Sequence, residues 1–164
     1  MIQHQIDTDH RKNQTRLLQR GEHSQALMQA QGDVSDDTLL GKPVNGEDAV
    51  SMLLQLSGRI HRVCTAVSLA SRESSASRLS ETKVRFREIT DSEAHAYWNT
   101  GEPKGKAGGY AIQGRGAVFV ESISGSYSGV MGLPLFETAA LLAEFAVLPW
   151  QSPAAVGEKG VAQS

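Results

Sequence analysis

Three polar side chains stand in tight backbone contexts where they could meet a phosphate or a base. Lys42 lies between Gly41 and Pro43, directly before a predicted helix whose positive end would favour an anion. Lys106 and Gln113 lie in residues 101–138, which hold more than half of the 16 glycines of the chain. A Gln amide offers the paired donor and acceptor that can read a pyrimidine edge. Taken alone, each residue is more often an ordinary surface side chain, because Lys and Gln are mostly exposed.

The glycine-rich stretch is predicted to be ordered. Glycine is costly inside regular elements, but it is useful where the backbone turns through positive φ or approaches a ligand closely. A disordered linker is the alternative, yet the apolar run over residues 117–123 predicts a strand, which linkers do not carry. A P-loop does not fit, because the spacing from Gly101 to Gly105 is too short and Ala107 replaces the Ser or Thr that would hold magnesium.

The totals restrict the class of protein. A chain of 164 residues fits one domain, and its formal net charge of −2 gives no general reason to bind nucleic acid. No window approaches the roughly 18 apolar residues of a membrane span, and the polar N-terminus is unlike a secretory signal. The single Cys64 lies in an apolar run and is expected to be a buried thiol. We therefore expect a cytoplasmic protein that binds neither membranes nor nucleic acid.

The composition divides the chain into three parts. Residues 1–33 are rich in Gln and His and are predicted to be a polar segment outside the domain. A helix over residues 11–29 is one prediction for this segment, and loose attachment or disorder is an alternative that the thin apolar stripe favours at least equally. Residues 34–146 are predicted to form the domain. Residues 147–164 contain prolines and glycines without periodicity, which is typical of a flexible tail.

Within the domain, helices alternate with strands. Asn45 is a predicted N-cap of a helix that ends at Gly58, and Thr90 opens a second helix with a capping box. Pro134 marks the first position of a third helix, which runs to about residue 145. Residues 63–69 predict a strand, residues 71–80 a polar loop, and the alternation from Thr82 a strand with a solvated row of charges. The pattern is that of an α/β or α+β domain.

From residue 34 to residue 145 the chain resembles the Maf proteins, a family of nucleoside triphosphate pyrophosphatases also known as septum formation inhibitors. The matching segments follow one another in order along the chain: Leu40-Gly41-Lys42-Pro43, Leu56-Ser57-Gly58-Arg59 with His61, Thr65-Ala66-Val67, Thr82 with Val84 and Phe86, Gly101-Glu102-Pro103, Lys106-Ala107-Gly108 with Tyr110, Ile112-Gln113-Gly114, Gly125-Ser126-Tyr127, and Gly132-Leu133-Pro134 with Glu137-Thr138. The Ile-Gln-Gly and Gly-Ser-Tyr segments resemble the branch that hydrolyses dTTP and UTP to the monophosphate and pyrophosphate.

The resemblance implies a fold, a cofactor and a binding site. The fold would be the Maf/ITPase-like α/β fold, a mixed sheet flanked by helices. The family uses a divalent metal cation, is cytoplasmic and often forms homodimers. By resemblance Lys42 would contact the triphosphate, Gln113 would help to select the base, and Lys106 would line the same cleft.

The chain departs from the family pattern before residue 34. It lacks the N-terminal strand, the Ser-x-x-Arg-Arg phosphate loop and the Ala-Asp-Thr motif, so the catalytic and metal-binding residues are unknown. Asp33, Asp36 and Asp37 are the carboxylates to search for a replacement. Because hydrolysis of a phosphoanhydride needs a carboxylate to position metal or water, we expect little pyrophosphate release from a chain truncated in this way. A non-catalytic nucleotide-binding or partner-interaction module is the alternative.

Overall fold

The computed structural model describes residues 16–20, 23–35 and 38–147 of the chain. The strands are β1 Arg16–Arg20, β2 His23–Ser35, β3 Thr38–Leu40, β4 Ile60–Ala70, β5 Ser75–Phe86 and β6 Val120–Ser124. The helices are α2 Gly46–Leu56, α3 Asp91–Asn99, α4 Tyr127–Met131 and α5 Leu135–Glu144, with 3-10 helices η2 Ala107–Gly109 and η3 Arg115–Phe119. The expectation of an α/β fold with a sheet flanked by helices is confirmed.

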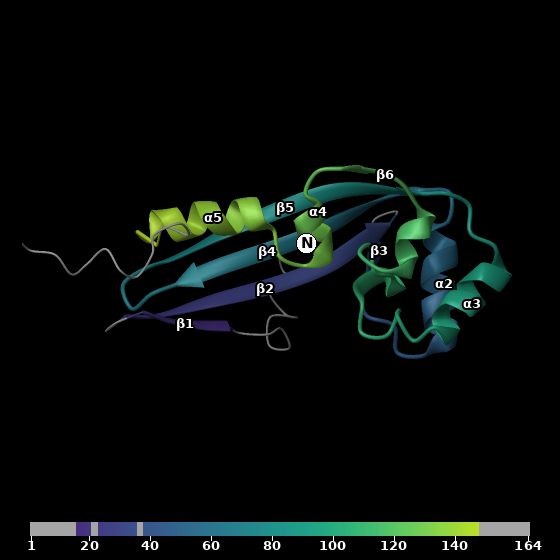
Figure 1. The fold of residues 1–164 in the computed structure, drawn as a ribbon, viewed down its shortest axis with the longest axis horizontal. Coiled ribbons are helices and arrows are strands. Elements are labelled where there is room, and N and C mark those ends of the chain that lie inside the picture. The colour runs from purple at the N-terminus through teal and green to yellow at the C-terminus, as the bar shows by residue number, and fades with distance from the viewer. Residues whose placement is uncertain (1–15, 21–22, 36–37, 148–164) are drawn as a thin grey trace, which may run out of the picture.

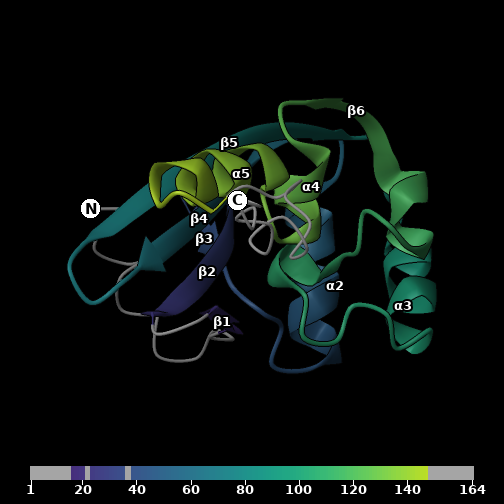
Figure 2. The same cartoon turned by 60° about the vertical axis from the view of Figure 1, so that its left-hand side comes forward.

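One sheet runs through the described part of the molecule, in the order β1-β2-β4-β5-β6, with β3 also paired to β2. Every pairing between these described strands is antiparallel, so this part of the sheet is antiparallel rather than mixed. Figure 1 shows α5 along one end of the long strands, while α2 and α3 gather at the other end. Figure 2 shows the same separation from a second side, with α4 between the two groups.

The predicted helix over residues 11–29 is wrong. Residues 16–20 and 23–35 are strands, and β2 pairs with β4 from Ala26↔Ala70 to Val34↔Arg62. The apolar stripe that suggested a helix is thin, and strand pairing with residues 62–70 of β4 outweighs a weak local propensity. Residues 1–15 of the predicted polar segment lie outside the described residues, as does the predicted tail from residue 148 onward.

The predicted loop over residues 71–80 is only partly correct. Ser71 and Ser74 form the turn, where the Ser71 N–H donates to the Ser74 carbonyl over 2.8 Å, and β5 already begins at Ser75. Its first five residues are mostly exposed and do not alternate between polar and apolar side chains, so they carry no pattern that marks a half-buried strand. From Thr82 the strand alternates as predicted, with Thr82, Val84 and Phe86 buried and the charged side chains between them exposed.

The helix starts follow the sequence closely. The side chain of Asn45 accepts a hydrogen bond from the Asp48 N–H, and Thr90 and Glu93 form the predicted capping box. Pro134 was predicted to be the first helical residue, but it is the N-cap residue and α5 begins one position later, at Leu135. The strand predicted over residues 117–123 is partly wrong, because residues 115–119 form η3 and the strand occupies Val120–Ser124.

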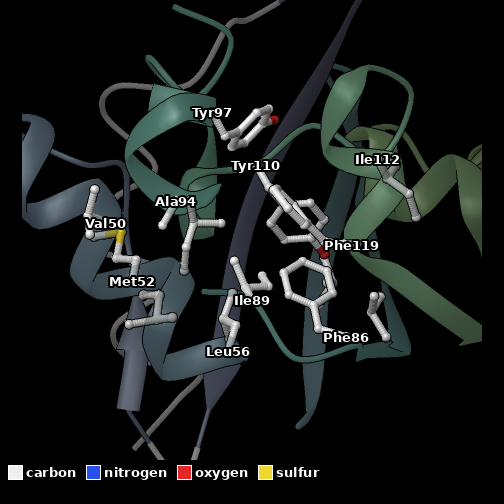
Figure 3. Close-up of a cluster of buried hydrophobic side chains, with 14 of the residues drawn as sticks. Val50, Met52, Leu56, Phe86, Ile89, Ala94, Tyr97, Tyr110, Ile112 and Phe119 are labelled. Atoms are coloured by element: carbon white, nitrogen blue, oxygen red, sulfur yellow. The ribbon is translucent and has the colours of Figure 1, made fainter. Parts of the chain in front are cut away.

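The buried side chains form two clusters. The larger one joins α2, α3, β5 and the glycine-rich stretch, and its aromatic centre is Phe86, Tyr110 and Phe119 (Figure 3). The smaller one lies under α5, where Leu141 packs with Val67 and Leu69 of β4. Cys64 is buried, as predicted. None of the helices in the described ranges is both long and apolar enough to cross a membrane.

Candidate functional site

The loops that carry Lys42 and Lys106 are joined by a backbone hydrogen bond. The N–H of Gly108 donates to the carbonyl of Gly41 over 3.0 Å, so η2 lies against the segment that precedes α2. Both lysine side chains are exposed, and neither ammonium group pairs with a described residue. The two cations therefore project from neighbouring loops and are available to an anionic ligand.

The positive end of α2 is already occupied by the protein. The N–H of Asp48 donates to Asn45 Oδ1 over 2.8 Å, and the N–H of Val44 donates to Asp48 Oδ2 over 2.9 Å. Glu47 and Asp48 place two carboxylates in the first turn. The two carboxylates repel a phosphate at this end of the helix, so the structure does not support the predicted contribution of the α2 dipole to anion binding. Lys42 remains as the cation of this loop.

Gln113 lies at an exposed turn whose backbone is held by two side chains. The Tyr97 hydroxyl accepts from the Ala111 N–H over 3.1 Å and donates to Glu102 Oε1 over 2.7 Å. Glu102 also accepts from the N–H groups of Arg115 and Gly116, over 2.9 and 3.0 Å. The amide of Gln113 itself makes no hydrogen bond with a described residue, so it is available for a ligand.

At two positions that follow Gln113, this network leaves no room for a side chain larger than that of glycine. A Cβ at Gly114 would lie 2.6 Å from the carboxylate oxygens of Glu102, and a Cβ at Gly116 would lie 2.6 Å from the Tyr97 hydroxyl. Neither neighbour can move without losing its hydrogen bonds to the turn. The density of glycine in this stretch thus has a specific cause here, namely close approach of the backbone to Glu102 and Tyr97.

The charge of Glu102 is stabilised where it lies. Burial alone would raise the pKa of this carboxyl, but the hydrogen bonds from Tyr97, Arg115 and Gly116 outweigh burial and lower the pKa. Burial, together with the hydrogen bond to Glu102, raises the pKa of Tyr97 far above its ordinary value. Glu102 is therefore ionised and Tyr97 is neutral at physiological pH, which is the arrangement that the hydrogen bonds require.

His61 contacts the glycine-rich stretch at Tyr110. Its Nε2 lies 2.9 Å from the Tyr110 hydroxyl, and its ring packs edge-on against Phe86 and Tyr110. Burial lowers the pKa of His61 to about 4, so the imidazole is neutral near pH 7. Its Nδ1 atom is buried and has no hydrogen-bond partner in the described part of the chain. A neutral, enclosed histidine of this kind holds Tyr110 in place.

The Gly125-Ser126-Tyr127 segment is fastened to the sheet. The N–H of Ser126 donates to Thr82 Oγ1 over 2.8 Å, and Thr65 Oγ1 donates to the Gly129 carbonyl over 2.8 Å. The φ of Gly125 is 131°, and a Cβ there would lie 2.7 Å from Thr82 Oγ1. The buried threonines of β4 and β5 thus position this turn, while the Tyr127 side chain remains exposed.

A shallow groove lies elsewhere on the surface, along α2. It measures about 580 Å³ and is lined by Glu47, Val50, Ser51, Leu54, Gln55, Arg59 and His95. None of the three predicted binding residues lines it. The described ranges also contain no group of three His, Cys, Asp or Glu side chains that could hold a metal ion.

Sequence reasoning identified the exposed groups and missed the residues that hold them. Glu102, Tyr97 and His61 have no local spacing that marks them as partners, since their contacts span 5 to 49 positions. One signal was present: the glycines at 114 and 116 flank a charged residue and imply that something occupies their Cβ positions. Which residue fills that space depends on the fold.

The chain is similar over most of its length to a known family. The family described as Maf-like protein matches residues 12–145. The match begins before residue 34, where the sequence analysis places the domain boundary, so that boundary remains a prediction.

Several curated relatives share this similarity. A dTTP/UTP pyrophosphatase of Saccharophagus degradans is 56% identical over 119 residues, which cover 73% of this chain and 57% of the relative. One of Alkalilimnicola ehrlichii is 59% identical over 114 residues, covering 70% and 56%. One of Hahella chejuensis is 44% identical over 142 residues, covering 79% and 71%. The chain thus spans little more than half the length of the first two relatives.

Proposed function

Because the chain belongs to the Maf-like protein family, we propose that it binds dTTP and UTP at a nucleoside triphosphate pyrophosphatase site. The reaction of such a site is hydrolysis to the monophosphate and pyrophosphate. One observation carries the proposal. The polar groups of Lys42, Lys106 and Gln113 have no partner among the described residues, and they project from loops that backbone and Glu102 hydrogen bonds hold in place.

Each of these residues has a chemical role in the proposal. The ammonium groups of Lys42 and Lys106 neutralise part of the triphosphate charge, and charge-assisted hydrogen bonds to phosphate are stronger than neutral ones. The amide of Gln113 offers a donor and an acceptor to the base. Uracil and thymine present an N–H donor beside a carbonyl acceptor, so one amide can satisfy both groups at once.

Hydrolysis also requires a carboxylate, and Glu102 is not available for that role. Its oxygens already accept from Tyr97, Arg115 and Gly116. Asp33 lies on β2, and Asp36 and Asp37 lie outside the described residues. We therefore keep the expectation that this chain releases little pyrophosphate, and the engagement of Glu102 favours nucleotide binding without hydrolysis as the second candidate function.

The divalent cation implied by the family does not fit the described residues as a protein-only site. No three carboxylate, imidazole or thiol groups come together in the described ranges. Magnesium is usually bound through substrate phosphates and one or two carboxylates, and Lys42 and Lys106 supply cations instead.

A comparison of UTP with UMP tests the roles of the three residues. Calorimetric titration is expected to show that Lys42→Ala and Lys106→Ala each weaken UTP binding by about tenfold, while UMP binding changes less, because the lysines contact the outer phosphates. Gln113→Ala should weaken both nucleotides, since both carry the base. Lys83→Ala, on the exposed row of β5, is the matched control and should change neither affinity. Equal losses for UTP and UMP in the lysine variants would contradict their assignment to the triphosphate.

Pyrophosphate release separates the two candidate functions. The purified chain is incubated with dTTP or UTP and magnesium or manganese, and the released pyrophosphate is measured. Binding without release supports the non-catalytic function. Turnover at ordinary enzyme rates would contradict it, and Asp33→Asn, Asp36→Asn and Asp37→Asn would then identify the carboxylate that the reaction uses.

A cytoplasmic homodimer remains part of the proposal. Met131, Leu135 and Phe136 are exposed apolar side chains at the junction of α4 and α5, and a contact between two chains would cover them. Sedimentation equilibrium is expected to show a dimer that Phe136→Ser dissociates. A monomer at all concentrations would contradict this part of the proposal.

A further inference from the structure

The turn that carries Gln113 is held from both sides by one pair of side chains. Before Gln113, the Ala111 N–H donates to the Tyr97 hydroxyl over 3.1 Å. After it, the N–H groups of Arg115 and Gly116 donate to the two oxygens of Glu102. The hydroxyl of Tyr97 donates to Glu102 over 2.7 Å, so both anchors form one connected network. The Gly114 N–H closes the turn itself by donating to the Ala111 carbonyl over 3.1 Å.

The pair is itself fixed by α3. Tyr97 is buried in this helix, and its ring packs edge-on against Phe119 at 5.2 Å between centroids. Glu102 follows the end of the same helix, where its N–H donates to Thr100 Oγ1, which in turn donates to the Tyr97 carbonyl. The two anchors therefore cannot move independently, and the position of the turn is coupled to a packed helix.

Charge-assisted hydrogen bonds and close packing both hold the turn against Glu102 and Tyr97. An ionised carboxylate that accepts from two backbone N–H groups makes charge-assisted hydrogen bonds, which are about twice as strong as neutral ones. The Cβ positions of Gly114 and Gly116 are filled by the Glu102 oxygens and the Tyr97 hydroxyl, so the turn fits closely against them. Gln113 is the exposed residue between these fixed points.

We propose that Glu102 and Tyr97 are positioning residues that set the base selectivity of Gln113. This inference rests on the proposed function, in which the Gln113 amide pairs with a pyrimidine edge. Uracil presents a carbonyl acceptor where cytosine presents an amino donor, so discrimination needs an amide whose position and orientation are fixed. A displacement of about 1 Å in a positioning group can undo such an arrangement.

The test measures discrimination rather than affinity alone. The full chain and its variants are titrated with UTP and with CTP, and the ratio of the two dissociation constants is compared. Wild type is expected to prefer UTP. Glu102→Gln removes the charge but keeps the shape, and Tyr97→Phe removes only the hydroxyl. Each is expected to reduce the preference by about tenfold, because the backbone N–H groups on both sides of Gln113 lose hydrogen-bond partners and the turn that carries its amide is no longer fixed.

Two variants make the test specific. In the Gln113→Ala background, Glu102→Gln is expected to cause no further loss of discrimination, because two residues that act through one group are not additive. Glu121→Gln removes an exposed carboxylate that pairs with Arg85 at 2.9 Å, and it should leave the preference unchanged. Thermal unfolding shows which variants remain folded, and Tyr97→Phe provides the milder change should Glu102→Gln fail to fold.

The outcomes separate the positioning role from the proposed function. If wild type discriminates and both Glu102→Gln and Tyr97→Phe discriminate equally well, only the positioning role is overturned. An equal loss of discrimination in the Gln113→Ala background would also overturn it, because the effect would not pass through Gln113. A folded wild type that binds neither nucleotide would overturn the proposed function, and this inference with it.

Discussion

At the scale of single residues, the molecule separates side chains that meet solvent from those that hold them. Lys42, Lys106 and Gln113 are exposed, and the residues behind them are enclosed and paired. The sequence alone predicted the exposed groups, because their types and tight backbone contexts are local features. His61 and Glu102 lie in motifs that resemble the Maf family, but the sequence did not predict what they do, because their roles depend on contacts that only the fold creates.

Burial of neutral His61 is expected to make stability depend on pH. The pKa of His61 falls from 6.5 to about 4 on folding, so the unfolded chain binds the proton more tightly. The stabilisation is present above the unfolded pKa and is lost as pH falls from 6.5 to about 4, by about 3 kcal/mol in total. Denaturant titrations at several pH values measure it, and His61→Gln should abolish the decline.

Two comparisons check this assignment. The hydrogen bonds from Arg87 and Thr90 lower the pKa of Glu93 from 4.5 to about 2, so its contribution is lost only below about pH 4.5. Gln55 is an exposed residue of α2 that carries no ionisable group, and Gln55→Ala should retain the decline of wild type between pH 6.5 and pH 4. A decline that persists in His61→Gln would contradict the account.

Gly125 is expected to tolerate no side chain. Its φ of 131° lies in the region that favours glycine, and the Cβ would lie 2.7 Å from Thr82 Oγ1. Gly125→Ala should lower the free energy of unfolding by about 1–3 kcal/mol. Gly41→Ala is the matched control, because no atom lies within 4 Å of its Cβ position and its φ is not positive. Equal stability of the two variants would contradict the close approach seen at Gly125.

At the scale of elements, the helices were predictable and the strand edges were not. The side-chain caps at Asn45 and Thr90 can be predicted from the residue types of a few neighbouring positions, and both caps are present. The strand β2 is defined by its pairing with β4, from Ala26↔Ala70 to Val34↔Arg62, and local propensity does not contain information about a partner that distant in the chain. The start of η3 likewise involves a distant residue, because Glu102 accepts from the N–H groups of residues 115 and 116.

The capping box of α3 is expected to stabilise the domain. Thr90 Oγ1 accepts from the Glu93 N–H, and the Glu93 carboxylate accepts from the Thr90 N–H over 3.0 Å. Thr90→Ala should lower the free energy of unfolding by about 1 kcal/mol. Ser122→Ala, at an exposed position of β6, serves as the control in the same denaturant titration. If both variants unfold at the same denaturant concentration as wild type, the cap contributes nothing.

At the scale of the whole molecule, the larger apolar cluster and the proposed site share one scaffold. Phe86 packs with Tyr110 and Phe119 of the glycine-rich stretch, and the ring of Tyr97 packs against Phe119 (Figure 3). The hydroxyl of Tyr97 in turn holds the turn of Gln113. The smaller cluster under α5 is separate. The α/β class and the family could be predicted from sequence, because ordered motifs carry them. The arrangement of the turn could not, since it depends on contacts between distant segments.

The proposed function requires that the domain bind a pyrimidine nucleotide through Gln113. Calorimetric titration of the purified chain with UTP tests it most directly, alongside Gln113→Ala and the control Lys83→Ala. UTP is expected to bind saturably to wild type and to Lys83→Ala. Gln113→Ala should weaken UTP binding by about tenfold or more, because the base edge would lose its paired hydrogen bonds. Absence of binding to a cooperatively folded wild-type chain, or equal affinity in Gln113→Ala, would contradict it.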